Sequence, residues 1–212
     1  MFKLKKPLYI MKRLPMKYRK LWFKCLPLLK GARRGDINHT SEMVDFLLDN
    51  VQRFGFELDV LIPVSMLHDI HHSGILEEHF KNIRVEERLS NGKVVKLSAS
   101  AKVAEDLLTE VGYDKEKIPE ILDIITTHDK SRVDDDEAGV LYNTKNKKHF
   151  HDIDIIARCN KARVKRLRKI CQTRKELIRV MQSQIKLIFD NEIRSIAEKK
   201  FKDIAGIVEV QW

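Results

Sequence analysis

Apolar side chains recur every three or four residues along most of the chain, which is the period of α-helices with one buried face. This pattern predicts helices over residues 15–29, 36–54, 58–71, 104–111, 114–125 and 152–200. Asp36 and Gly55 are typical of the start and the end of a helix, and Thr173 marks an expected break in the last stretch. Pro27 is expected to bend or end the first helix.

Two short segments have a different pattern. Asn91 and Gly92 stand between two segments that favour strands, and this pair is the strongest short signal for a hairpin, so a small β-hairpin is predicted near residues 83–97. The last six residues, IVEVQW, alternate between apolar and polar and are compatible with a further strand. The predicted fold class is therefore all-α, a helical bundle with a small β-hairpin.

Charge is distributed unevenly along the chain. Its 212 residues carry 41 Lys and Arg against 31 Asp and Glu, a net charge of +10. Residues 1–34 hold 12 basic and no acidic residues, residues 35–160 hold 15 and 25, and residues 161–212 hold 14 and 6. An anion-binding site in the acidic middle must therefore use local cations. We interpret residues 1–15 as a basic arm that precedes a single domain over residues 16–212.

The cysteines and the distribution of apolar residues indicate the cellular compartment of the protein. Three widely spaced cysteines without a C-x-x-C spacing indicate reduced thiols. The N-terminal segment is interrupted by charges, unlike a signal peptide, and no apolar stretch approaches the roughly 20 residues of a membrane span. We therefore expect a cytoplasmic protein with no membrane partner.

Histidines and aspartates occupy selected places in the predicted helices. His39 lies near the start of the helix over 36–54, the doublet His68-Asp69 lies near the end of the next helix, and His128 follows Ile125 by three residues. Asp154 lies near the start of the last helical stretch, where Asp152 is interpreted as an N-cap, with a fallback role as ligand. Imidazole and carboxylate together suit a divalent ion such as Mn, Fe, Co, Ni or Mg, and also Zn.

The ordered set His39, His68-Asp69 and Asp154 resembles the H…HD…D signature of the HD superfamily of metal-dependent phosphohydrolases. The surrounding segments are similar as well: RRGDINHTSEMV, PVSMLHDIHHSG, AEDLLTEVGY, IPEILDIITTHD and DIDIIAR, which together cover roughly residues 20–165. The resemblance implies an HD-domain-like bundle with its motifs within 33–165, followed by C-terminal helices over 166–212. It also implies hydrolysis of a phosphate ester or anhydride, with His39, His68, Asp69 and Asp154 as the metal ligands.

Further site residues follow from the resemblance and from spacing. His72 occupies a position near the attacking water in such enzymes, so His72 and Asp69 are candidates to orient or deprotonate that water. His128 matches a histidine that many members keep close to the site. Ser98, Ala99 and Ser100 stand where two-metal members carry another histidine, which favours one metal ion. The predicted phosphate-binding cations are Arg34, Lys130 and Arg158.

The leading hypothesis is a metal-dependent phosphohydrolase that acts on a small phosphorylated substrate, a nucleotide being the favoured class. One alternative is a phosphodiesterase or nuclease that acts on nucleic acid or cyclic nucleotides. The basic arm, Trp22, Phe23 and residues 161–179 would then hold the polyanion. The other alternative is a non-catalytic nucleic-acid-binding module stabilised by the metal. By default, residues 161–179 are interpreted as a solvated helix face, and the edge of a homodimer is a further alternative.

Overall fold

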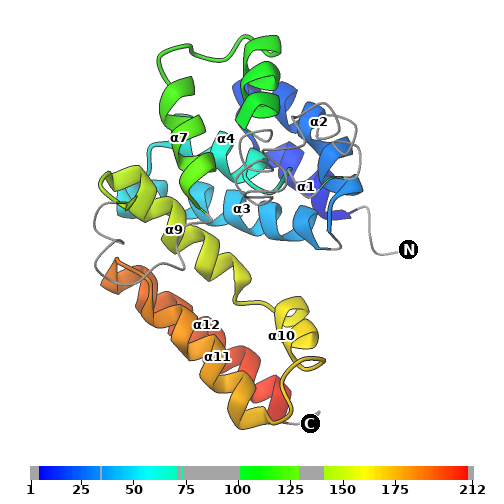
Figure 1. Ribbon diagram of the computed structural model, residues 1–212, viewed down its shortest axis with the longest axis vertical. Coiled ribbons are helices and arrows are strands. Elements are labelled where there is room, and N and C mark those ends of the chain that lie inside the picture. Colours follow the sequence, from blue (N-terminus) through cyan, green and yellow to red (C-terminus); the bar gives the residue numbers. More distant parts are fainter. Residues whose placement is uncertain (1–4, 34, 71–72, 74–100, 129–140, 210–212) are drawn as a thin grey trace, which may run out of the picture. The chain divides into compact units, whose positions relative to one another are not determined.

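The computed structural model describes residues 5–33, 35–70, 73, 101–128 and 141–209. Every regular element in these ranges is a helix, so the all-α fold class is confirmed for the part of the chain that the structure describes (Figure 1). The predicted hairpin near residues 83–97 lies outside the described residues and stays a prediction. Within the described ranges, no helix is long and apolar enough to cross a bilayer.

The chain divides into two compact units, Met1–Lys147 and Lys148–Trp212. The sequence predicted a basic arm over 1–15 and one domain over 16–212, and this division stays a prediction. Within that arm, α1 (Lys5–Arg13) packs against α3 (Asp36–Phe54). Ile10 and Leu14, four residues apart, are buried, and Arg13 forms ion pairs with two aspartates of α3. Ile10 and Leu14 therefore belong to the core of the first unit.

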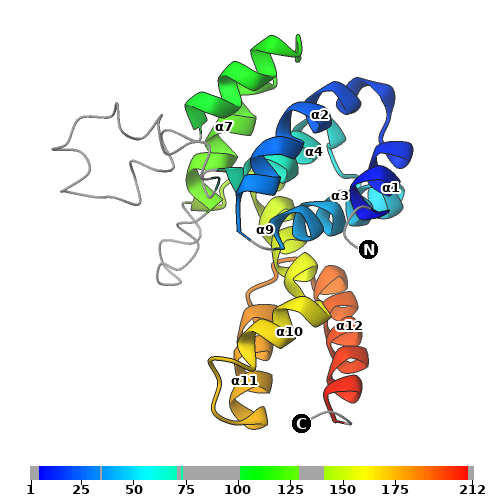
Figure 2. The ribbon, with the colours of Figure 1, turned by 90° about the vertical axis from the view of Figure 1, so that its right-hand side faces the viewer.

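The first unit is built around α4 (Leu58–Leu67), in which every residue from Val60 to Leu67 is buried. It packs against α2 (Met16–Gly31), α3 and α7 (Ile118–Thr127), and residues 101–110 form a further helix (Figure 2). The helix predicted over 36–54 is confirmed with both ends, and Gly55 caps it at φ 61° with its N–H on Val51 O at 2.9 Å. By contrast, α2 continues through Pro27, where its end was one expected outcome. The end of α4 at Leu67 comes earlier than predicted.

The second unit contains most of α9 (Lys145–Arg158), followed by α10 (Lys161–Leu167), α11 (Arg174–Lys186) and α12 (Asn191–Glu209). The break predicted near Thr173 is confirmed, because the Thr173 hydroxyl accepts the N–H of Glu176 at the start of α11. Two further breaks, at Asn160 and over residues 187–190, were not predicted. The strand considered for 207–212 is wrong over residues 207–209, which belong to α12.

Asp152 is not the N-cap of its own helix, because α9 begins at Lys145. Its fully buried carboxylate accepts the backbone N–H groups of Phe189 and Asp190 at 2.8 and 2.9 Å. These groups immediately precede α12 and would otherwise lack partners in that helix. Asp152 therefore ties α9 to the start of α12, which is a structural role.

Candidate metal centre

The turn after α4 brings three predicted ligands together. His39 lies in the first turns of α3, and His68 and Asp69 follow directly after Leu67. One potential ligand atom from each of His39, His68 and Asp69 lies within 4.8 Å of the other two. We call these three residues the His/Asp cluster. Since α4 is buried along its length and packs on α3, the core of the first unit holds the cluster in place.

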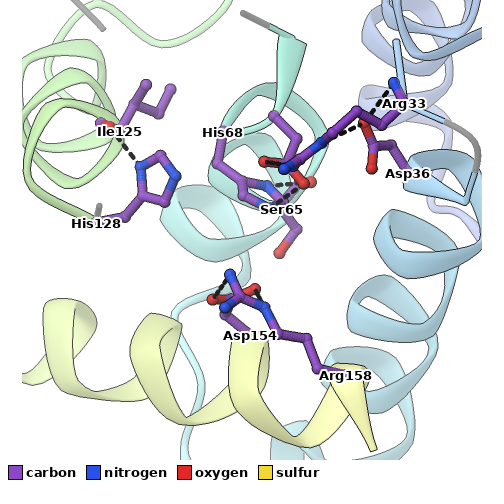
Figure 3. A network of polar contacts seen from close by, with 9 residues as sticks. Arg33, Asp36, Ser65, His68, Ile125, His128, Asp154 and Arg158 are labelled. Carbon is purple, nitrogen blue, oxygen red and sulfur yellow. Dashed lines mark hydrogen bonds and ion pairs between the residues drawn. The ribbon is translucent and has the colours of Figure 1, made fainter. Parts of the chain in front are cut away.

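Backbone carbonyls fix the orientation of two imidazole rings (Figure 3). Nδ1 of His68 lies 3.0 Å from the carbonyl oxygen of Ser65, and Nδ1 of His128 lies 2.6 Å from that of Ile125. A carbonyl oxygen can only accept a hydrogen bond, so each Nδ1 carries a proton and donates it. In each neutral ring, Nε2 is then the atom with the lone pair. Metal-binding histidines usually have this arrangement, in which the other ring nitrogen donates its proton to a neighbouring acceptor.

The lone pair of His68 faces a carboxylate. Nε2 of the fully buried His68 lies 3.3 Å from Oδ2 of Asp69. Both atoms are acceptors when the ring is neutral, so their approach is favourable only with a positive charge between or on them. A proton on Nε2 or a metal ion bound to both atoms provides that charge. Either a protonated imidazole or a bound metal ion therefore accounts for this approach.

His128 lies against the cluster from α7. Its ring meets that of His68 edge to face at 5.4 Å between centroids, and the His39 ring lies 5.5 Å from His68 on the same measure. His128 is buried and sits at the C-terminal end of α7. The structure thus gathers three imidazoles from three segments that are distant in the sequence.

Arg33 adds a cation to the cluster. Its Nη2 lies 3.0 Å from Oδ1 of Asp69, and its Nε lies 3.5 Å from Oδ2 of Asp36. Burial would raise the pKa of Asp69, but the positive surroundings of His68, His39 and Arg33 hold it well below its usual range. Burial raises the pKa of Asp36, and the neighbouring Asp69 carboxylate adds to the rise. Asp69 is therefore the carboxylate of this site that stays ionised over the widest pH range.

Sequence reasoning chose Arg34 as the local cation and missed Arg33, its neighbour. Arg34 lies outside the described residues, whereas the guanidinium of Arg33 is half exposed and contacts Asp69. A local signal existed: Asp36 follows three residues later at the start of α3, and its carboxylate accepts the backbone N–H of Arg33 at 3.0 Å. This bond fixes the backbone of Arg33 where the chain enters α3.

Asp154 and Arg158 belong to the second unit, where they pair with each other on α9. Two contacts join them, Nη2 to Oδ2 at 2.5 Å and Nε to Oδ1 at 3.1 Å (Figure 3). The sequence assigned metal binding to Asp154 and phosphate binding to Arg158. In the structure the predicted cation therefore neutralises the predicted ligand across one helical turn.

Other candidates fall elsewhere. His72 and Lys130 lie outside the described residues, as do Ser98, Ala99 and Ser100. Trp22 is fully buried in α2, so its predicted part in holding a polyanion is wrong, while Phe23 beside it is exposed.

No family model, curated protein or solved structure matches this chain. The HD-superfamily resemblance therefore depends on the sequence segments that suggested it.

Proposed function

We propose that this protein is a metal-dependent phosphohydrolase that cleaves a phosphate ester or anhydride of a small phosphorylated metabolite, with nucleotides as the favoured class. The observation that carries the proposal is the 3.3 Å approach of His68 Nε2 to Asp69 Oδ2, with His39 beside them. This mixed nitrogen and oxygen donor set suits Mn, Fe, Co, Ni, Mg or Zn. The H…HD…D motif of the sequence adds Asp154 as a fourth ligand of a single ion.

A divalent ion bound by these donors would supply a water of lowered pKa and neutralise charge on the phosphoryl oxygens. The chain's own groups supply the remaining chemistry. Because Nδ1 of His128 donates to Ile125, Nε2 of His128 is the atom that accepts a proton. His72 is a second candidate for proton transfer, on the resemblance alone.

Arg33 is the proposed phosphate-binding cation. Its Nη2 faces Asp69 and its Nε faces Asp36, while Nη1 has no partner within the described part of the chain. That edge of the guanidinium can donate two hydrogen bonds to phosphoryl oxygens. Asp36, anchored to the backbone of Arg33, keeps the side chain directed toward the cluster.

The test combines metal analysis with a substrate screen. Purified full-length protein would be analysed for bound metal and then assayed for phosphate release from nucleotides and other phosphoesters with Mn, Co, Ni or Mg added. We expect turnover that Asp69→Asn abolishes together with metal retention. The matched control is Asp106→Asn. Asp106 is an exposed aspartate that pairs with Lys102 in the helix over residues 101–110, away from the His/Asp cluster.

Two results would contradict the proposal. One is a protein that retains metal but hydrolyses no phosphoester or anhydride in a broad panel. If metal removal then lowers the melting temperature, the non-catalytic alternative is favoured. The other is an Asp69→Asn variant with normal metal content and activity.

A further inference from the structure

The stretch that contains α10, the residues after it and the start of α11 is strongly basic. Residues 161–179 contain nine basic residues and one acidic residue. Six of the basic side chains are exposed and form no ion pair within the described part of the chain: Lys161, Lys165, Arg166, Lys169, Lys175 and Arg179. We call these six residues the basic face. Three exposed lysines of the first unit, Lys17, Lys24 and Lys102, each pair with a carboxylate instead.

The one acidic residue of this segment does not neutralise the basic face. Glu176 accepts the backbone N–H of Gln172 at 2.8 Å and donates its own N–H to the hydroxyl of Thr173 at 3.1 Å. These two bonds lie at the start of α11 and are similar to a capping box, with the N–H of Gln172 in place of that of the N-cap Thr173. The Glu176 carboxylate therefore bonds to the backbone and not to a basic side chain. The positive charges of the basic face remain available to a partner.

We propose that the basic face binds the phosphate backbone of double-stranded nucleic acid without reading its sequence. Residues 161–179 contain no aromatic side chain, so bases of a single strand would find no stacking platform there. Lysine and arginine side chains alone suffice for phosphate contacts, and a duplex presents the densest row of phosphates. This binding is separate from the His/Asp cluster and uses none of its residues.

An anionic membrane is the less suitable partner. A helix that lies in a membrane interface inserts an apolar face. Here Val164 and Leu167 of α10 and Leu177 of α11 are buried within the protein. Ile170 is the only large apolar side chain of residues 161–179 that is strongly exposed, at 72%. The charge is thus present without the apolar surface that lipid insertion needs.

The test measures binding of the full-length protein to a blunt 20-base-pair duplex of DNA or RNA, over a range of salt concentrations. The variant Lys161→Gln/Lys165→Gln/Lys169→Gln removes three charges from the basic face. The control Lys186→Gln/Lys199→Gln/Lys202→Gln removes three exposed lysines from α11 and α12. We expect the first variant to weaken binding about tenfold or more. Its slope of log Kd against log salt should fall by about 2 to 3, one contact contributing roughly 0.9 for B-DNA.

Three outcomes would overturn the proposal. The wild-type protein does not bind either duplex at low salt, the control variant loses as much affinity as the basic-face variant, or the basic-face variant loses binding to phosphatidylserine vesicles but keeps binding to the duplex. The last outcome would identify an anionic membrane as the partner. Circular dichroism establishes that both variants are folded. Asp69→Asn should bind the duplex normally, so a failed hydrolase assay does not affect this test.

Discussion

His68 shows how the surrounding backbone prepares one side chain for chemistry. The hydroxyl of Ser65 bonds to the carbonyl of Leu61 at 2.7 Å, and the carbonyl of Ser65 receives Nδ1 of His68. The last turn of α4 thereby fixes both the tautomer and the direction of the ring. His128 is held in the same way at the end of α7. Two helix ends thus present two Nε2 atoms to one small region.

Arg33 allows a prediction at the level of one side chain. Arg33→Ala should lower kcat/KM for a phosphate substrate about tenfold to a hundredfold, the usual effect of losing a charge-assisted hydrogen bond. Arg33→Lys should recover part of the loss, because lysine keeps the charge but not the planar group. Metal content should not fall, since Arg33 is not among the proposed ligands. Steady-state kinetics with metal analysis measures both.

Lys30→Ala is the control for this prediction, because Lys30 is a nearby exposed cation at the end of α2. It should leave kcat/KM within about twofold. Normal kcat/KM in Arg33→Ala, with metal retained, would exclude Arg33 as the phosphate-binding residue.

The roles of individual residues could be predicted where a sequence motif marks them, but not where they depend on contacts with residues far away in the sequence. His39, His68 and Asp69 were found because they stand in a recognisable order, and the structure brings these three together. Arg33 was missed because its role depends on Asp69, 36 residues away. Trp22 was assigned to polyanion binding for its aromatic ring, although its spacing with Tyr18 and Cys25 puts it on the buried face of α2.

Elements were predicted well wherever the deciding signals are local. Gly55 ends α3 through its own positive φ, and Thr173 starts α11 through its own hydroxyl. The sequence failed where tertiary contacts decide. Asp152 has the features of an N-cap, yet it lies within α9 and serves two N–H groups that are 37 and 38 residues away. Local propensity carries no information about such partners.

Asp152 gives a prediction at the level of elements. Asp152→Ala should destabilise the protein by about 1–3 kcal/mol, because it leaves two backbone N–H groups without their buried acceptor. The specific readout is hydrogen exchange, in which the amides of Phe189 and Asp190 should lose protection. Asp203→Ala, an exposed position on α12, is the control. Unchanged protection at residues 189 and 190 would show that the carboxylate does not hold this junction.

Charge organises the molecule as a whole. The acidic middle of the sequence supplies carboxylates that pair with cations from distant segments of the first unit. Lys17 and Tyr18 of α2 bind Asp59, while Lys117 and Asn146 bind Glu57. These contacts join the start of α4 to segments that lie far away in sequence. The net charge of +10 therefore combines an acidic middle segment, in which carboxylates such as Asp59 and Glu57 are paired, with the basic face.

This arrangement predicts how stability depends on pH. The hydrogen bond from Lys117, with that from Asn146, holds the pKa of Glu57 below its ordinary value of 4.5. The folded state therefore binds fewer protons at Glu57 than the unfolded state does, so this contribution is present above pH 4.5 and is lost as the pH falls through the lowered pKa. Burial of Asp36 acts in the opposite direction, because it raises the pKa of that carboxyl.

Comparing wild type with Glu57→Gln removes the contribution of Asp36, since both proteins contain it. We expect the free energy of unfolding, measured in urea between pH 6 and pH 3, to fall more steeply in the wild type than in Glu57→Gln. Both bonds to Glu57 reach an exposed part of the surface, so the difference should be modest and should shrink at high salt. Glu116→Gln, at an exposed position near Lys117, is the matched control and should follow the wild type. Parallel curves for wild type and Glu57→Gln would show that the contacts of Glu57 persist in the unfolded chain or contribute nothing to folding.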